Sequence, residues 1–110
     1  MESRQCEVPS LDDCLAALNH VNRRRVLLSL LDSETHTGGA VDLESLPLHS
    51  SESHPRVALQ HVHLPKLTEL GLVEADWERQ TVRAGPQFEE IVPLLKLLDD
   101  NRQDIPGEWV

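Results

Sequence analysis

The sequence contains no long apolar run, no tyrosine and few other aromatic residues. No apolar run approaches the ~20 residues of a membrane-spanning helix. The opening, MESRQCEVPS, lacks the charged and apolar segments of a signal peptide. We therefore expect a soluble, cytoplasmic protein without a membrane partner. Because Phe88, Trp77 and Trp109 are the only aromatic residues besides histidine, we expect one domain of packed helices with an aliphatic core.

The sequence also lacks the motifs of common enzymes. It has no Gly-rich phosphate loop, no nucleophile elbow and no His-Glu-x-x-His motif. Adjacent carboxylates such as Asp12 and Asp13 point apart on a helix and are explained by solvation and capping. Cys6 and Cys14 are the only cysteines, and we interpret them as ordinary thiols, although a disulfide between them stays open. We expect no enzymatic activity and no cofactor.

The charge balance is acidic, and lysine is scarce. There are 19 acidic residues against 10 basic ones, and only Lys66 and Lys96 are lysine. A net charge of −9 repels nucleic acid in dilute buffer. In molar salt the Debye length is about 3 Å, so net charge has little effect at a distance. The composition resembles that of halophilic cytoplasmic proteins, and it predicts a fold that weakens in low salt.

The start of the chain predicts a flexible lead and two helices. The lead covers residues 1–10, and Ser10 is a suitable N-cap for a helix over residues 11–18. Asn22 is predicted to cap a second helix, and Arg23 to Arg25 fall in its first turn, the unfavourable end for cations. The predicted buried face of the second helix holds Val26, Leu27, Leu30 and Leu31.

A loop, a short strand and a short helix are predicted next. Residues 32–40 form the loop, with Gly38-Gly39 as its pivot. Val41 adds the strand. Asp42 is placed to cap a third helix over residues 43–48, with Leu43 and Leu46 facing inward.

The most informative segment is RVALQHVHLPKLTELGLV, residues 56–73. It predicts a helix that begins at Pro55, a position where proline is tolerated, and ends at Leu70. Pro65 removes a hydrogen bond inside this helix, so we expect a kink near His61 or two helical segments. Gly71 predicts an abrupt stop, because glycine enters the left-handed region at low cost. The predicted apolar face holds Val57, His61, Leu64, Leu67 and Leu70–Leu72.

A β-hairpin is predicted directly after this helix. Residues 72–77 and 81–83 are its strands, residues 78–80 are its turn, and Gly85-Pro86 ends it. A last helix covers residues 87–99. The apolar positions of that helix occupy more than one stripe, so we expect part of it to face a second copy of the chain.

This order predicts a mainly helical fold with a β-hairpin wing, a winged helix-turn-helix. The helices over residues 43–48 and 55–70 form the helix-turn-helix. The predicted winged helix-turn-helix domain covers residues 11–85. A C-terminal helix over residues 86–100 and a flexible tail over residues 101–110 follow it.

Parts of this order resemble the winged-helix transcriptional regulators of the ArsR-like class, and more narrowly the small uncharacterised winged-helix proteins of haloarchaea. The residues that carry the resemblance are Leu15–Leu18, Asn22–Leu31, His63-Leu64, Leu67 and Gly71–Val73. The resemblance implies a DNA-binding regulator. It also implies a homodimer packed through the first and last helices, with the helix over residues 55–70 in the major groove of double-stranded DNA.

Basic and amide side chains fall on three elements that meet DNA in such a fold. Glutamine can pair with adenine, whereas arginine and lysine can pair with guanine or phosphate. Arginines of a wing suit phosphate or minor-groove contacts. For each residue alone, an ordinary solvated surface is the alternative interpretation. The candidate DNA-binding residues are Arg56, Gln60, His63, Lys66, Arg79, Arg83, Arg23 and Arg24.

Three further expectations concern dimerisation, a second function and metal. The expected dimerisation residues are Leu11, Leu15, Ile91, Leu94, Leu95 and Leu98. The net charge of −9 and Pro65 favour an alternative, a protein–protein interaction module on the same scaffold without DNA binding. His61 and His63, with His49, His54 or a cysteine, could hold a metal, but residues two apart on a helix face different ways. We expect no metal, with His61 packed against the second helix and His63 exposed.

Overall fold

A computed structural model of the chain describes residues 8–36, 39–50 and 53–110 and, of residues 33–36, the backbone only. The fold is mixed: helices are combined with a small three-stranded antiparallel sheet. The elements are α1 (Leu11–Ala17), α2 (Val21–His36), β1 (Val41–Asp42), η1 (Leu43–Ser45), α3 (Pro55–Ala58), η2 (Leu59–His63), α4 (Leu64–Glu69), β2 (Val73–Asp76), β3 (Thr81–Ala84), α5 (Phe88–Asp100) and η3 (Arg102–Asp104).

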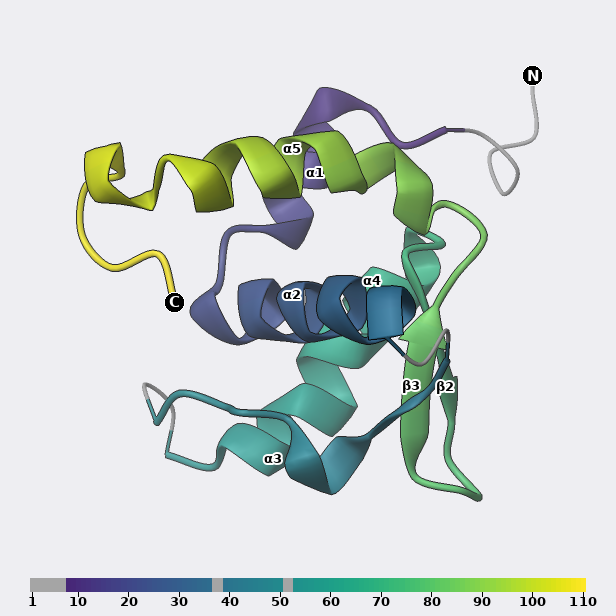
Figure 1. The fold of residues 1–110 in the computed structure, drawn as a ribbon. Helices are drawn as coiled ribbons and strands as arrows, with labels where there is room; N and C mark the ends of the chain where they lie inside the picture. The colour runs from purple at the N-terminus through teal and green to yellow at the C-terminus, as the bar shows by residue number, and fades with distance from the viewer. Residues whose placement is uncertain (1–7, 37–38, 51–52) are drawn as a thin grey trace.

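Helix α2 runs through the middle of the molecule. Figure 1 shows it between α5 on one side and α3 on the other, with α4 passing behind it and the sheet standing at one end. Helices α3, η2 and α4 follow one another without a break, and we call this continuous segment, Pro55–Glu69, the rod. None of the helices in the described ranges combines the length and the apolar character that a membrane crossing requires.

The sheet has the strand order β1-β3-β2, so β3 is the central strand. Val73 pairs with Ala84 and Asp76 with Thr81 in the β2–β3 hairpin. The hairpin predicted for residues 72–83 is therefore confirmed. The short strand predicted at Val41 is also confirmed, because Val41 pairs with Val82.

The first two helices begin at polar caps. The Ser10 hydroxyl accepts a hydrogen bond from the Asp13 amide at 3.1 Å, and the Asp13 carboxylate accepts one from the Ser10 amide at 3.1 Å, which confirms the predicted cap. At α2 the predicted cap is wrong. His20, not Asn22, has the capping role, because the Asn22 amide donates to His20 Nδ1 at 3.0 Å.

Asn22 is instead a buried tie between α2 and the loop before the rod. Its side-chain amide donates to the His49 carbonyl at 3.1 Å, and its side-chain oxygen accepts from the His49 amide at 2.6 Å. A buried amide satisfied in this reciprocal way fixes the position of that loop.

Two predictions for residues 32–48 need correction. Helix α2 continues to His36, so the loop predicted for residues 32–40 is wrong over its first half, where no glycine or proline opposes a helix. Gly38 lies outside the described residues. The third helix shrinks to the 3₁₀ turn η1, because the proline at position 47 pushes Leu46 into the extended region. Leu43 and Leu46 are buried as predicted.

The rod contains a π-helical turn just before Pro65. The Leu64 amide donates to the Leu59 carbonyl, five residues back. A proline has no amide hydrogen and its ring crowds the carbonyl four residues earlier, here that of His61, and a π-turn relieves both problems. The predicted irregularity near His61 is confirmed.

The π-turn also changes which rod residues face inward. It inserts one extra residue into the helical repeat, so residues before it rotate relative to those after it. Leu59 is buried, whereas Val57 is 55% exposed. His63 is buried and His61 is exposed. The predicted inward orientation of Val57 and His61, and the predicted exposure of His63, are wrong for this reason.

Gly71 ends the rod as predicted, at φ +78°. The Leu72 amide donates to the Leu67 carbonyl at 3.0 Å, and the Gly71 amide donates to the Thr68 carbonyl at 2.9 Å. These two bonds form a Schellman motif, which needs a left-handed residue at this position. The chain then enters β2 at Val73 with no intervening loop.

The end of the chain packs against α2 and α5. We expected a flexible tail over residues 101–110, but Trp109 is only 7% exposed and belongs to the core cluster. Its indole nitrogen donates to the Asp99 carboxylate at 2.9 Å. Arg24 donates to the Trp109 carbonyl at 2.6 Å, and the Arg24 guanidinium lies 5.3 Å from the centre of the Trp109 ring. These contacts of Trp109 hold the end of the chain against α2 and α5.

The core is aliphatic, as the sequence predicts. Phe88 and Trp109 are its only aromatic members among the described residues. Cys14 is a free, buried thiol on α1, and burial, with the negative charges of Asp13 and Glu90, raises the pKa of this thiol. Cys6 lies outside the described residues.

Candidate functional site

The rod carries no carboxylate before its last residue, Glu69. The sequence contains no Asp or Glu from residue 53 to residue 68, although the whole chain has 19. Arg56, Gln60 and His61 are exposed on this segment, and Lys66 is half-buried. This gap in the distribution of acidic residues is a sequence signal that the predictions above do not use. It makes the rod a neutral to positive surface on an otherwise acidic chain.

Arg56 also has a structural task. Its Nη1 donates to the Leu43 carbonyl at 2.5 Å, and its Nη2 donates to the carbonyls of Glu44 and Leu46 at 3.1 and 3.0 Å. These bonds hold η1 against the start of the rod. Arg56 therefore lies on the candidate surface with part of its donor capacity already used.

His63, a candidate DNA-binding residue, lies in the interior at 2% exposure. Its Nδ1 accepts a hydrogen bond from Arg23 Nε at 3.2 Å, and its ring centre lies 4.3 Å from that of His20. The structure places His61 on the outer face in its stead. The interpretation of His63 as an exposed reading residue is thus corrected.

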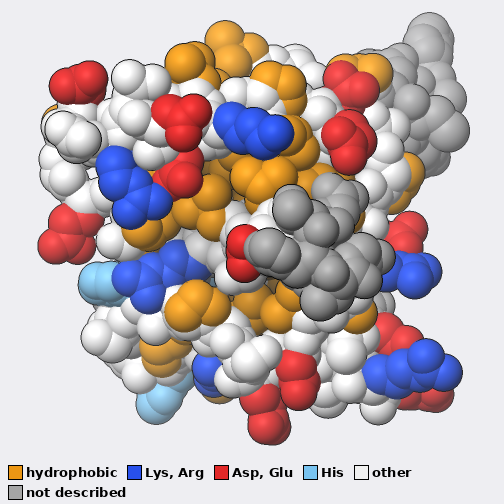
Figure 2. Space-filling model, in the orientation of Figure 1, with side chains coloured by type: hydrophobic (Ala, Val, Ile, Leu, Met, Phe, Trp, Pro, Cys, Tyr) orange, Lys and Arg blue, Asp and Glu red, His pale blue; other side chains and the backbone are white. Residues whose placement is uncertain are grey.

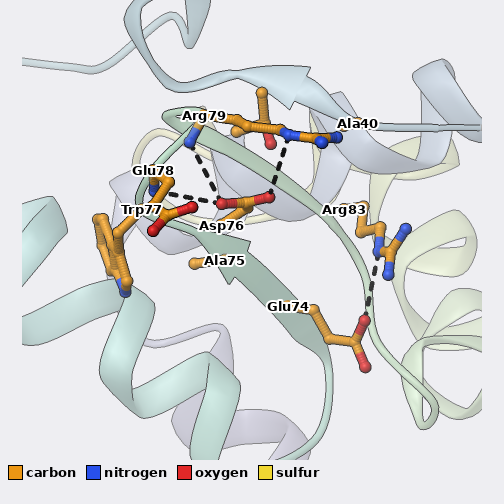
Figure 3. A pocket seen from close by; sticks show the side chains of 9 residues that line it. Ala40, Glu74, Ala75, Asp76, Trp77, Glu78, Arg79 and Arg83 are labelled. Carbon is orange, nitrogen blue, oxygen red and sulfur yellow. Dashed lines mark hydrogen bonds and ion pairs between the residues drawn. The ribbon is translucent and has the colours of Figure 1, made fainter.

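The hairpin carries both candidate wing arginines on its surface. Arg79 lies 3.8 Å from Asp76, and Arg83 lies 3.3 Å from Glu74, as Figure 3 shows. The Asp76 carboxylate also accepts from the amides of Glu78 and Arg79 at 3.1 and 3.2 Å, which shapes the turn. Exposed ion pairs of this kind are weak, so either arginine can exchange its carboxylate for a phosphate at little cost.

Arg23 and Arg24 are engaged inside the protein. Arg23 Nη1 donates to the Ala16 carbonyl at 2.6 Å and to Asn19 at 3.0 Å. Arg24 Nη1 donates to the Leu18 carbonyl at 2.7 Å, and burial lowers the pKa of the Arg24 guanidinium. The unexplained arginines of the first turn of α2 thus bind the carbonyls at the end of α1. Arg23 and Arg24 therefore connect the start of α2 to the end of α1 by hydrogen bonds.

The six expected dimerisation residues divide into three groups. Leu11 and Leu15 on α1 are 64% and 49% exposed. Ile91 and Leu95 on α5 are fully buried in the core of the single chain, so they cannot contact a partner, and that part of the expectation is wrong. Leu94 and Leu98 are half-buried. Leu97, which is not one of the six, is 60% exposed.

Hydrophobic side chains reach the surface along α5 and in the space between α5 and α2, with charged side chains among them (Figure 2). The same view shows acidic and basic side chains next to each other over the tip of the hairpin. The α1–α5 side of the molecule is thus apolar in places, whereas the hairpin tip is charged but balanced.

A hollow of about 470 Å³ lies between η1, the rod and the hairpin tip. Trp77 lines it and is 42% exposed, a high value for a tryptophan. The strand predicted for residues 72–77 ends at Trp77, and the sequence prediction assigns this residue no binding role. A tryptophan next to a predicted turn was the signal that could have drawn attention to it.

Metal binding finds no support in the described part of the chain. No group of three or more His, Cys, Asp or Glu residues lies close enough there to hold an ion.

The comparisons with known proteins concern this same region. Residues 46–83 match the model of a family described as a domain of unknown function, DUF7344. That stretch contains the loop before the rod, the rod itself and most of the hairpin, and it is less than half of the chain. No curated protein and no solved structure matches the sequence.

Proposed function

We propose that the chain is a DNA-binding transcriptional regulator with a winged helix-turn-helix fold, of the ArsR-like type found in haloarchaea. The observation that carries this proposal is an exposed rod without a carboxylate before Glu69, which passes through Gly71 directly into a hairpin with Arg79 at its tip and Arg83 on β3. In the proposal the rod is the recognition helix and the hairpin is the wing.

The proposed DNA-binding surface differs from the sequence prediction in four residues. His63 is buried, and Arg23 and Arg24 are tied to protein carbonyls, so we leave them out. His61 joins the surface because the π-turn brings it outward. The revised surface consists of Arg56, Gln60, His61, Lys66, Arg79 and Arg83.

The acidity of the chain is compatible with this function in a high-salt cytoplasm. At molar salt, screening removes the long-range repulsion between a net charge of −9 and DNA. Binding then depends on short-range hydrogen bonds and ion pairs at the surface itself, where the rod offers no carboxylate before Glu69.

We further propose a homodimer, built through the α1–α5 side. Leu11, Leu15 and Leu97 are large apolar side chains that are about half exposed or more. Their burial in a dimer would leave the rod and the hairpin of each copy free for DNA.

The proposal is tested by fluorescence polarisation with labelled fragments of host DNA at molar KCl, the protein being kept at full length. The variants Gln60→Glu and Arg79→Glu place a carboxylate on the surface, and each is expected to weaken binding about tenfold or more. Lys96→Glu on α5 makes the same change of charge as Arg79→Glu at an exposed site away from the rod. Equal losses for all three variants would show that only net charge matters and would contradict the proposed surface.

The second candidate function is a protein-interaction module that does not bind DNA. Val57 and Val62 support it, because they are 55% and 51% exposed on the rod, where a DNA-reading helix gains little from them. The paired wing arginines also support it. The absence of DNA affinity at every salt concentration, with recovery of one stoichiometric protein partner that Val62→Asp abolishes, would favour this function.

A further inference from the structure

The hollow between η1, the rod and the hairpin tip has the shape and chemistry of a binding site for a flat ring. Its floor is made of Leu43, Leu59 and Leu64, which are 6%, 3% and 0% exposed. Its volume of about 470 Å³ falls in the range of small-ligand pockets. Three elements meet there, so a bound group would contact the rod and the hairpin together.

Trp77 gives the hollow an aromatic wall. The side chain points away from the ion pairs of Arg79 and Arg83 and toward the rod (Figure 3). The Trp77 carbonyl accepts a hydrogen bond from Gln80 Nε2 at 2.7 Å, which fixes the turn beneath the ring. An indole that is 42% exposed beside an apolar floor offers a surface on which another planar ring can stack.

Polar groups line the same hollow and can read the edge of such a ring. Gln60 and Gln80 are exposed and carry amides, each with donors and an acceptor. Glu44 adds a carboxylate, which accepts hydrogen bonds only. Arg56 fixes the backbone of Glu44 through a hydrogen bond of 3.1 Å. The hydrophobic floor and the indole wall suit the flat faces of a nucleobase. The amides and the carboxylate suit its polar edge.

We propose that this hollow binds a single unpaired nucleobase, stacked on Trp77 and hydrogen-bonded at its edge by Gln60, Gln80 and Glu44. The inference rests on the proposed function, because the base would belong to DNA bound along the rod and the hairpin. A fully paired duplex keeps its bases stacked and cannot fill the hollow, so a bulged or unpaired base is the preferred target.

The carboxylate of Glu44 makes the inference more specific. Adenine, cytosine and guanine carry an exocyclic amino group that can donate to a carboxylate, whereas thymine carries none. The hollow therefore prefers amino-bearing bases. The variant Glu44→Gln, which supplies both a donor and an acceptor, is expected to remove the discrimination against thymine.

The experiment compares duplexes that are identical except for one bulged nucleotide, with the full-length protein at molar KCl. Both tryptophans fluoresce, but a base can stack only on Trp77, because Trp109 is buried at 7% exposure. We expect the bulged duplex to bind at least about fivefold more tightly than the paired one and to quench emission. Free nucleoside monophosphates form a second arm, which separates a base within DNA from a free nucleotide.

The matched variants are Trp77→Leu and Trp109→Phe, with circular dichroism to show that each is folded. Trp77→Leu should lose the preference for the bulge while keeping the affinity for paired DNA. Trp109→Phe should keep both the preference and the quenching. Retention of the bulge preference by Trp77→Leu would overturn the inference.

The remaining outcomes separate the inference from the proposed function. Equal binding of bulged and paired duplexes would overturn the inference and leave the proposed function standing. Quenching by free nucleotides without any DNA binding would support the nucleobase site and overturn the regulator. No response to DNA or nucleotides would overturn both.

Discussion

The two ends of the β2–β3 hairpin differ in packing: its root, at Gly71–Val73 and Gly85–Gln87, is crowded, and its tip, at Trp77–Gln80, is exposed. At the root the backbone is crowded: the Gly85 amide donates to the Leu72 carbonyl at 2.9 Å, and the Gln87 amide donates to the Gly71 carbonyl at 2.8 Å. At the tip, Trp77 to Gln80 are exposed. The root thus fixes the angle between the rod and the hairpin, while the tip is left to make contacts with other molecules.

The arginines show the same contrast. Arg24 on α2 donates to three backbone carbonyls, those of Leu18, Glu108 and Trp109. Arg79 at the tip has one exposed carboxylate partner, Asp76. The comparison shows that an arginine surrounded by carbonyls stabilises the fold, whereas an arginine surrounded by solvent stays available for binding.

The largest expected effect is at the root. In Gly85→Ala the new Cβ would lie 2.5 Å from the Gly71 carbonyl oxygen and 2.9 Å from the Val73 amide nitrogen. Backbone atoms on both sides cannot move without breaking the sheet, so the free energy of unfolding should fall by about 3 kcal/mol. Urea unfolding followed by circular dichroism measures this loss. A stability equal to that of the parent chain would show that the root is not the rigid part.

The second expected effect concerns the arginines. Arg24→Met keeps much of the aliphatic stem but removes the hydrogen bonds to three carbonyls, and should lower the free energy of unfolding by about 2–3 kcal/mol. Arg79→Met is the control at the hairpin tip and should change it by less than about 0.5 kcal/mol. If urea titrations gave similar losses of unfolding free energy for Arg24→Met and Arg79→Met, the proposed difference between the two arginines would be wrong.

The third effect compares two glycines with positive φ. Gly71 has φ +78° and a Cβ there would lie 2.9 Å from the Gln87 side chain, whereas Gly107 has φ +75° with no neighbour within 4 Å. Both substitutions by alanine carry the left-handed penalty of about 1 kcal/mol. Gly71→Ala should cost up to about 1 kcal/mol more, because Gln87 must move. Thermal melts of the two variants give the difference, and equal melting temperatures would argue against a crowded root.

The fourth effect depends on pH and concerns the last segment of the chain. Burial opposes ionisation of Asp99, but hydrogen bonds from Arg102 and Trp109 outweigh it and lower the pKa of this carboxyl group. A lowered pKa in the folded state contributes stability that is present above the unfolded value of about 3.9 and is lost as the pH falls through the folded value.

Asp99→Asn should therefore be less stable than the parent chain at neutral pH, and the gap should close in acid. Urea midpoints for both chains from pH 7 down to pH 3 measure this. A gap that stays constant over that range would show that the charge of Asp99 does not anchor Trp109.

Several elements could be predicted because their signals are local. Ser10 and Asp13 form a capping box within four residues of chain, and Gly71 ends the rod through its own backbone preference. The irregularity caused by Pro65 is local too. In each case the residues that determine the local structure are neighbours in the sequence, so the sequence pattern is enough to predict it.

The errors have one physical origin, which is the dependence on distant partners. The inward face of the rod required the exact length of the π-turn, and one extra residue exchanged the positions of His61 and His63. Arg23 pairs with a histidine 40 positions away. The hollow at Trp77 is formed by residues from three elements, and no spacing in the sequence announces it.

The sequence by itself determined the order of helices and strands, the stop at Gly71 and the acidic balance of the chain, because propensity, capping and charge are properties of short segments. Only the tertiary structure decided which side chains stay available. Folding brings together Arg24 and Trp109, which are 85 positions apart. Trp77 and Arg79 stay exposed to solvent because no other part of the chain that the structure describes packs over them.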